Sequence, residues 1–337
     1  MASRVVLHIG LLKSGTTYVQ QRMLHSWEAL AEHGVLFPGR ALERRWRAQV
    51  CAVADLLRID RRPPGYYDGM WKEMVDEIAE WDGTAILSME FLCWAPPEKI
   101  QEIVDAFAPV PVEVVVTARD LGRTLPAMWQ EEIKNAHTMT MADYLRDVRS
   151  GEGGGRRFWD DHALDAILQR WVDGVGAEHV TLVTVPPPGA DSSLLWTRYC
   201  EAVGMPTDLA VDIATMNESL GAASVEVMRR LNLALAPYEL PWERYAHGVK
   251  DPFATKILAG HRRDEQPIGL KAPRWLRQRA KEINDRVAAL PIRVIGDVRE
   301  LTPVDVPGVD PAKVSVDARF DAAVAGLAGL LAYEPEQ

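Results

Sequence analysis

A glycine-bounded segment near the N-terminus, Gly10-Leu11-Leu12-Lys13-Ser14-Gly15-Thr16-Thr17, has the residue types of an anion-binding loop. It follows a short apolar run and precedes a segment of helical spacing, which predicts a strand, a tight loop and a helix. Glycines let the backbone approach a ligand, and the first amides of a helix favour negative charge. The alternative is an ordinary strand-to-helix turn. The candidate ligand-binding residues are Lys13, Ser14, Gly15, Thr16 and Thr17.

The spacing within this loop bears on which anion it binds. Gly10 and Gly15 have the four-residue gap of the GxxxxGK[ST] phosphate-binding loop, but Thr16 occupies the lysine position and the loop's lysine is Lys13. The lysine that holds the β- and γ-phosphates of ATP is therefore absent from its usual place. We expect a shorter anion, such as a 5′-phosphosulfate, with Lys13 at its bridging oxygen. A P-loop kinase or NTPase with an atypical loop is the alternative.

The run from His8 to Thr17 resembles the start of bacterial sulfotransferases that use 3′-phosphoadenosine 5′-phosphosulfate (PAPS). The resemblance covers roughly residues 5–235, with specific motifs at 8–17, 88–90 and 119–129. It implies an enzyme that transfers a sulfuryl group from PAPS, without a metal, to a hydroxyl or amine of a small-molecule, glycan or lipid acceptor. A scaffold that binds the nucleotide but has lost catalysis is a further alternative.

The resemblance gives Arg119 a role at the nucleotide. In the family, an arginine at this strand end binds the 3′-phosphate and shares it with a serine eight residues later. That later position is Ala127 here, so one hydroxyl donor is missing. Its loss weakens binding by about 1.5–3 kcal/mol, which Arg123 or another arginine could offset. Alternatively, Arg119 and Asp120 form a surface ion pair at a helix start, where aspartate is a natural cap.

The resemblance also supplies a candidate catalytic base. The apolar run at 85–89 predicts a strand that ends next to Glu90, and Ser88 lies two residues earlier on the same face. The family carries its base in this segment, as His or as Glu, which makes Glu90 the candidate base and places Ser88 at the cofactor or acceptor. Lys13 is expected to stabilise the leaving phosphate. The alternative is that Glu90 caps the helix near Pro96 or faces solvent.

Short apolar runs alternate with segments of helical period, which predicts an α/β fold with a central parallel sheet covered on both faces. We expect a three-layer sandwich of the P-loop NTPase-like sulfotransferase type, with residues 1–337 as a single domain. About 1–210 would form the nucleotide-binding core, and about 211–337 a mostly helical part that contributes to the acceptor pocket. The predicted strands are 5–9, 85–89, 112–117, 180–185 and 292–295, and the predicted helices are 17–30, 98–107, 121–134, 141–148, 163–175 and 193–203.

The composition limits the classes of partner. The net charge of −10 argues against a general binder of nucleic acid or anionic membranes. Three separated cysteines without a CxxC pair predict neither disulfides nor a zinc site, and they fit a reducing cytosol. The N-terminus does not resemble a signal peptide, and no apolar run reaches the ~18–20 residues of a membrane-spanning helix. We expect a cytoplasmic enzyme, and a homodimer is left open.

Several segments have two interpretations. Gly151 to Gly155 predicts a flexible loop, either a plain linker or a mobile lid that brings Arg156 and Arg157 to an anion. The segment of His261, Arg262 and Arg263 with Gly269 and Lys271 is a candidate second nucleotide loop, although its spacing departs from the family pattern. Asn217 or Ser219 is the expected cap of a helix. Trp129 and Trp159 could wall the acceptor pocket, and His8 is expected in the core.

Overall fold

The computed structural model describes residues 2–39, 45–59, 62, 64–212 and 219–333. The chain folds into two compact units. The first unit comprises 1–120, 160–214 and 280–302, and the second comprises 121–159, 215–279 and 303–337.

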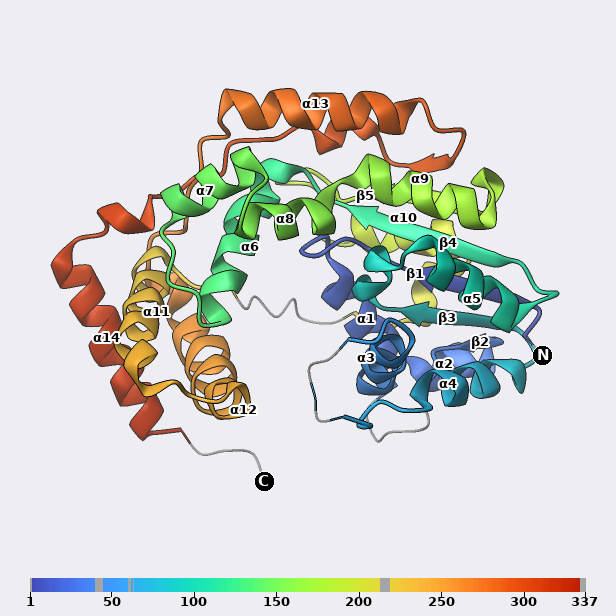
Figure 1. Cartoon of the computed structure of the whole chain (residues 1–337), viewed down its shortest axis with the longest axis horizontal. Coiled ribbons are helices and arrows are strands. Elements are labelled where there is room, and N and C mark those ends of the chain that lie inside the picture. Colours follow the sequence, from blue (N-terminus) through green and yellow to red (C-terminus); the bar gives the residue numbers. More distant parts are fainter. Residues whose placement is uncertain (1, 40–44, 60–61, 63, 213–218, 334–337) are drawn as a thin grey trace. The chain divides into compact units, whose positions relative to one another are not determined.

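The first unit is built on a six-stranded sheet in the order β2-β3-β1-β4-β5-β6 (Figure 1). Every neighbouring pair is parallel, so the carboxyl ends of the strands share one edge, where ligands bind in open parallel sheets. In the register of β1 and β3, His8 lies opposite Ser88. The strands are β1 (Arg4–His8), β2 (Val35–Leu36), β3 (Thr84–Ser88), β4 (Val112–Ala118), β5 (Val180–Thr184) and β6 (Arg293–Ile295).

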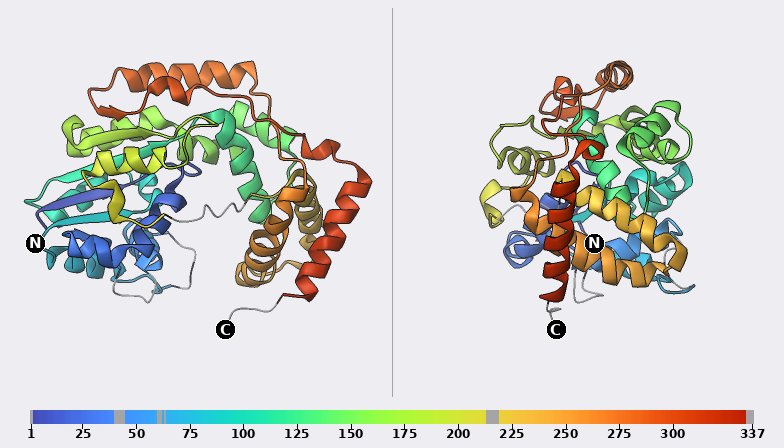
Figure 2. Two further views of the ribbon diagram at one scale, coloured as in Figure 1. Left: turned by 180° about the vertical axis from the view of Figure 1, so that it is seen from behind. Right: turned by 90° about the vertical axis from the view of Figure 1, so that its left-hand side faces the viewer.

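Helices cover both faces of this sheet, as the opposite views of Figures 1 and 2 show. On one face α1 (Thr16–His25) and α10 (Leu194–Val203) contribute Val19, Met23 and Tyr199 to a core cluster with strand residues. On the other face α5 (Pro97–Phe107) and α9 (Leu164–Val175) pack together, with α9 against β4 and β5. The predicted three-layer α/β architecture is confirmed. The unit also contains α2 (Trp27–Glu32), η1 (Glu90–Trp94), α3 (Arg45–Leu56), α4 (Met70–Ala79), η2 (Ala177–His179), η3 (Thr207–Leu209) and η7 (Val298–Leu301).

The second unit is helical. Its α6 (Leu121–Lys134) has the predicted bounds, and α11 (Ala222–Leu235) packs against both α6 and α14 (Val316–Leu331). The helices α8 (Gly154–His162) and α13 (Arg274–Ala288) continue from this unit into the first. The remaining elements are α7 (Met141–Ser150), α12 (Trp242–Tyr245), the π-helical segment η5 (Ala246–Leu258) and the short η4 (Ala236–Tyr238), η6 (His261–Asp264) and η8 (Pro311–Lys313).

The prediction of a flexible loop at Gly151 to Gly155 is wrong. Gly151 has a φ of 75° and ends α7, while Gly154 and Gly155 already belong to α8. A Cβ atom at Gly155 would overlap with the carbonyl oxygen of Asp147, so this glycine allows the close approach of two helices. The segment is therefore a helix junction and neither a linker nor a lid.

The cap predicted for α11 is also displaced. The helix begins at Ala222, and its N-cap is Gly221. This position holds glycine because a Cβ there would overlap with the Glu265 side chain. Ser219 lies two residues before the cap, and Asn217 lies outside the described residues. Glu265 instead accepts a hydrogen bond from the backbone N–H of Ser224 at 2.8 Å and so serves the first turn from another part of the chain.

The carboxylate of Glu226 on α11 is buried among arginines of the second unit. Arg229 donates two hydrogen bonds to it at 2.8 Å, Arg230 donates one at 2.9 Å, and Arg319 of α14 lies at 3.8 Å. Burial opposes the charge, but the hydrogen bonds and charges of Arg229 and Arg230 outweigh it and lower the pKa of Glu226. The charge of this carboxylate therefore joins α11 to α14.

Replacing Glu226 by Gln should lower the free energy of unfolding by about 2 kcal/mol at pH 7, because Arg229, Arg230 and Arg319 lose the charge of the buried carboxylate that they share. Because the pKa of Glu226 is lower in the folded state than the 4.5 of the unfolded chain, the ionised carboxylate stabilises the fold at pH values above 4.5. This stabilisation is lost as the pH falls through the pKa of the folded state. Urea unfolding of the wild type and E226Q should therefore converge in acid. E239Q, at an exposed glutamate, is the control, and equal losses in both variants would contradict the prediction.

None of the helices in the described part of the chain combines the length and apolarity needed to cross a membrane. Cys51, Cys93 and Cys200 are buried free thiols.

Candidate functional site

The loop between β1 and α1 is a tight turn with two left-handed residues. Lys13 has a φ of 63° and Gly15, the N-cap of α1, has a φ of 87°. Alternation of this kind turns successive amides toward a common centre and forms an anion-binding concavity. The first amides of α1, from Thr16 and Thr17, have no acceptor within the helix and add to this set. The predicted strand, loop and helix start are confirmed here, with Thr16 buried and Thr17 exposed. The helix predicted over 17–30 is interrupted at Ser26, which separates α1 from α2.

Gly10 sits where no larger residue fits. A Cβ atom there would overlap with Thr117 Oγ1 and would lie 2.7 Å from Thr16 Cγ2 and 2.8 Å from His8 Nε2. The loop can therefore pass over the strand ends because residue 10 has no side chain.

Gly10→Ala should destabilise the protein by about 3 kcal/mol, because the added methyl group overpacks the site and displaces the hydroxyl of Thr117. Gly260→Ala is the matched control, since a Cβ there meets nothing within 4 Å. This control should leave stability unchanged or raise it by up to about 1 kcal/mol. Thermal unfolding of both variants measures the difference, and equal midpoints would contradict the assigned packing.

A buried chain of hydrogen bonds supports the loop from below. His8 Nδ1 lies 2.7 Å from Ser88 Oγ, and His8 Nε2 lies 3.2 Å from Thr117 Oγ1. Thr117 Oγ1 in turn lies 2.8 Å from Ser14 Oγ, which donates to the carbonyl of Leu11 at 2.5 Å. Burial lowers the pKa of His8 to about 3, so its ring is neutral at physiological pH. The chain links the ends of β3, β1 and β4 to the loop.

In this network, the two serines predicted to bind the cofactor support the loop and the end of β3. The hydroxyls of Ser14 and Ser88 are both fully buried and engaged within the protein, and direct ligand contacts by them stay a prediction. The expectation of a core histidine at position 8 is confirmed. Sequence reasoning missed Thr117, although a polar residue near the end of a β-branched strand was a usable signal.

Three charged residues follow the ends of the three adjacent strands β3, β1 and β4. Glu90 comes two residues after β3, Lys13 lies in the loop after β1, and Arg119 comes directly after β4. The half-buried Arg119 contacts the loop itself, because its Nη1 lies 3.5 Å from the carbonyl oxygen of Lys13. The structure therefore brings the predicted base, the predicted lysine and the predicted arginine to one edge of the sheet.

The carboxylate of Glu90 is held by α1. Gln20 donates to Glu90 Oε2 at 3.1 Å and to the carbonyl of Ser88 at 3.0 Å. Burial raises the pKa of Glu90, while its own backbone amide, Gln20 and the charge of Lys13 act in the opposite direction. The positive charge of Lys13 thus favours the ionised form of the Glu90 carboxylate. A desolvated carboxylate with a raised pKa is suited to accept a proton.

One further contact holds the loop. His162, the last residue of α8, lies with Nε2 3.1 Å from the carbonyl oxygen of Leu12. No pattern in the sequence predicts this contact, because it joins positions 150 residues apart. The site can thus offer an anion a lysine, an arginine and a set of amides on a braced loop. Within the described residues, no three His, Cys, Asp or Glu side chains cluster in a way that could hold a metal ion.

The other predicted residues belong to the second unit. Arg123 and Ala127 lie on α6, and their part in nucleotide binding stays a prediction. The same holds for the candidate nucleotide loop at 261–271. Trp129 is buried and donates to the carbonyl of Met139 at 3.1 Å, so it is a core residue and not an open pocket wall. Trp159 is half-buried, with the Arg279 guanidinium 5.3 Å from its ring centre.

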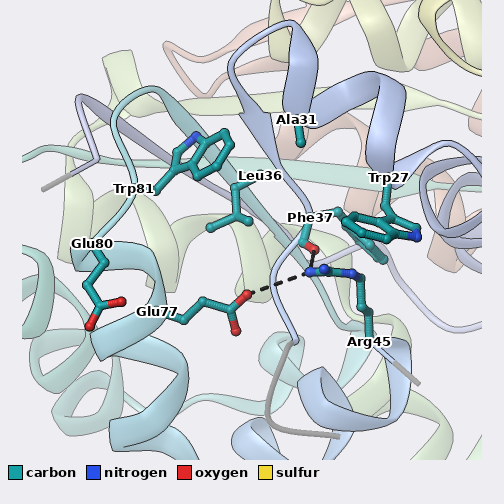
Figure 3. A pocket seen from close by; sticks show the side chains of 8 residues that line it. All are labelled: Trp27, Ala31, Leu36, Phe37, Arg45, Glu77, Glu80 and Trp81. Atoms are coloured by element: carbon teal, nitrogen blue, oxygen red, sulfur yellow. Dashed lines mark hydrogen bonds and ion pairs between the residues drawn. The ribbon is translucent and has the colours of Figure 1, made fainter. Parts of the chain in front are cut away.

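A separate hollow of about 260 Å³ in the first unit is lined by residues of α2, β2, α3 and α4 and of the segments that directly follow β2 and α4 (Figure 3). Arg45 lies across it, 3.9 Å from the ring centre of Trp27, and contacts Glu77 at 3.6 Å and the carbonyl of Phe37 at 3.1 Å. β2 is the edge strand, separated from β1 by β3. None of the predicted site residues lines this hollow.

Comparison with known proteins finds a likeness to one solved structure. No family model matches the chain, and no curated protein matches it. The crystal structure of a sulfotransferase from Alicyclobacillus acidocaldarius is similar to part of it, at 14% sequence identity and a TM-score of 0.40. The match covers 71% of this chain and 98% of that chain.

Proposed function

We propose that the protein is a sulfotransferase that moves a sulfuryl group from PAPS to a hydroxyl or amine of an acceptor. The observation that carries the proposal is the meeting of Lys13, Glu90 and Arg119 at the ends of three adjacent parallel strands. Two cations and a concave set of amides suit a ligand with two separate anionic groups. A desolvated carboxylate beside them suits removal of a proton from the acceptor.

The cationic residues divide between the two ends of the nucleotide. In this proposal the loop amides and Lys13 bind the 5′-phosphosulfate, and the Lys13 ammonium stabilises the negative charge that develops on the phosphate oxygen. Arg119 binds the 3′-phosphate, for which its planar guanidinium is suited. Ser14 and Ser88 hold the loop and the strand end.

Glu90 acts as the general base. As the acceptor oxygen bonds to sulfur, the bond between sulfur and the phosphate oxygen breaks, and the hydroxyl proton passes to a Glu90 carboxylate oxygen. The products are the sulfated acceptor and 3′-phosphoadenosine 5′-phosphate (PAP). Gln20, which donates to Glu90 Oε2 at 3.1 Å, orients the carboxylate that accepts the proton. The charges come from side chains and amides, so the reaction needs no metal.

The test is release of PAP from PAPS in the presence of EDTA, with a panel of phenols, sugars, hydroxylated lipids and amines as acceptors. Acceptor-dependent release is expected, and calorimetry should detect PAP binding. Magnesium-dependent ATP turnover without PAP binding would instead indicate a P-loop kinase or NTPase. PAP binding without turnover on any acceptor, unaffected by Glu90→Gln, would indicate a scaffold that has lost catalysis.

A further inference from the structure

The helix α14 packs on the second unit through its small residues. Ala322 and Gly326 are buried, and a Cβ at Gly326 would lie 2.9 Å from Leu258 and 3.0 Å from Phe253. A Cβ at Gly329 would overlap with Ile257. Glycine on this face therefore lets α14 lie close to η5, which it contacts together with α11.

Five of the six large apolar residues of α14, all except Leu330, lie on the other side and face solvent. They follow one another at intervals of four, four, three and four residues, a spacing that places them on one face of a helix. Soluble monomers rarely expose a contiguous apolar patch of this kind unless it binds something. This outer stripe comprises Val316, Phe320, Val324, Leu327 and Leu331, with exposed fractions of 69, 67, 50, 57 and 81%.

We propose that the outer stripe binds the same stripe of a second copy of this chain, with the two α14 helices antiparallel about a two-fold axis. A two-fold interface needs a self-complementary surface. The stripe has this property, because its spacing is nearly symmetric about its centre. Val316 comes opposite the partner's Leu331, and Phe320 opposite the partner's Leu327. The smaller Val324 lies closest to the axis, where the two backbones approach most closely.

The charges beside the stripe favour the antiparallel orientation. Asp317 and Asp321 are exposed in the N-terminal half of α14, and residues 322–331 carry no charge. A parallel pair would bring four carboxylates to one end, whereas the antiparallel pair places each set beside an uncharged segment. Opposed helix dipoles favour the same arrangement.

The same charges argue against a membrane surface as the occupant. Helices that lie in a membrane interface carry lysine and arginine on their polar face and are drawn to anionic lipids. The stripe is bordered by aspartates instead, on a chain with a net charge of −10. A second copy satisfies both the apolar stripe and its acidic border.

Sedimentation equilibrium of the full chain tests the interface. The wild type should have twice the mass of one chain at micromolar concentration, and F320E and L327E should each have the mass of one chain. Tyr238→Glu, at a 72% exposed aromatic residue outside α14, is the matched control and should stay dimeric. Circular dichroism verifies that the variants are folded, which is expected because the replaced side chains face solvent. A monomeric wild type, or dimeric F320E and L327E, overturns the proposal.

Cysteine cross-linking tests the orientation. The native thiols are buried, so a single new cysteine on α14 is the accessible thiol among the described residues under mild oxidation. V324C should form a covalent dimer with itself, and V316C should do so only when mixed with L331C. A covalent dimer of V316C alone, formed as readily as that of V324C, overturns the antiparallel pairing. Flotation of the wild type with vesicles of anionic lipid would also overturn the proposal.

Discussion

Replacing Glu90 by Gln is expected to lower kcat for sulfuryl transfer by about 10²- to 10⁴-fold, the usual contribution of a general base. The amide has nearly the shape of the carboxylate and can still receive the hydrogen bond from Gln20, but it cannot take up the acceptor proton. Calorimetry should find PAP affinity nearly unchanged, because the proposed nucleotide ligands Lys13 and Arg119 remain. Loss of PAP binding in E90Q would place Glu90 at the nucleotide instead of the acceptor.

The pH dependence of the reaction gives an independent test of this role. Burial raises the pKa of Glu90 above the usual 4.5. A base must be ionised, so kcat/KM should rise with pH through that raised value and then level off. E90Q should retain only a residual rate without this acidic limb. If E90Q retained the limb, another group would be the base.

The same shift predicts a gain in stability when the carboxylate is removed. The folded state holds the Glu90 proton more tightly than the unfolded chain, so stability falls as the pH rises from about 4.5 through the folded pKa. Glutamine removes this penalty, and E90Q should unfold at a higher temperature than the wild type at pH 7. E152Q, at an exposed glutamate, is the control and should show no gain. A gain in stability together with a loss of activity is typical of a functional residue.

The parallel sheet and the position of the charged residues after its strands could be predicted from the sequence. Runs of apolar and β-branched residues at 5–9 and 112–117 occur as β1 and β4 within a residue or two. Because parallel strands end at one edge, residues directly after the strands had to converge there, as Lys13 and Arg119 do. Strand β2 was missed because two residues give no periodicity.

The support of the site could not be predicted, because it depends on register and on distant segments. His8 meets Ser88 only because β1 and β3 pair in one particular register. Gln20 reaches Glu90 across 70 positions of sequence. Gly155 was misread for a related reason. Glycine is common in loops and at helix junctions alike, and the deciding contact is with the backbone of Asp147.

Replacing Lys13 by Gly should lower kcat by about 10²- to 10³-fold and weaken PAP binding, because the charge that stabilises the leaving phosphate is lost. Gly is the informative substitution because Lys13 has a φ of 63°. Left-handed backbone disfavours a side chain by about 1–2 kcal/mol, and this relief offsets the extra chain entropy of glycine. The loop should therefore keep its shape, and the unfolding temperature should change little.

Arg58→Gly is the matched control for K13G, because Arg58 also has positive φ, at 55°, and carries the same charge. Its ion pair with Asp55, at 3.1 Å, involves an arginine side chain that is 72% exposed, so losing it changes stability little. Both variants lose one positive charge and one left-handed side chain, but only Lys13 lies in the loop. In the PAP-release assay, kcat of K13G should be at least 100-fold below that of R58G. Calorimetry should show weaker PAP binding by K13G than by R58G. Equal activities would show that Lys13 serves the loop backbone alone, and the anion would then be held by the amides of α1 and by Arg119.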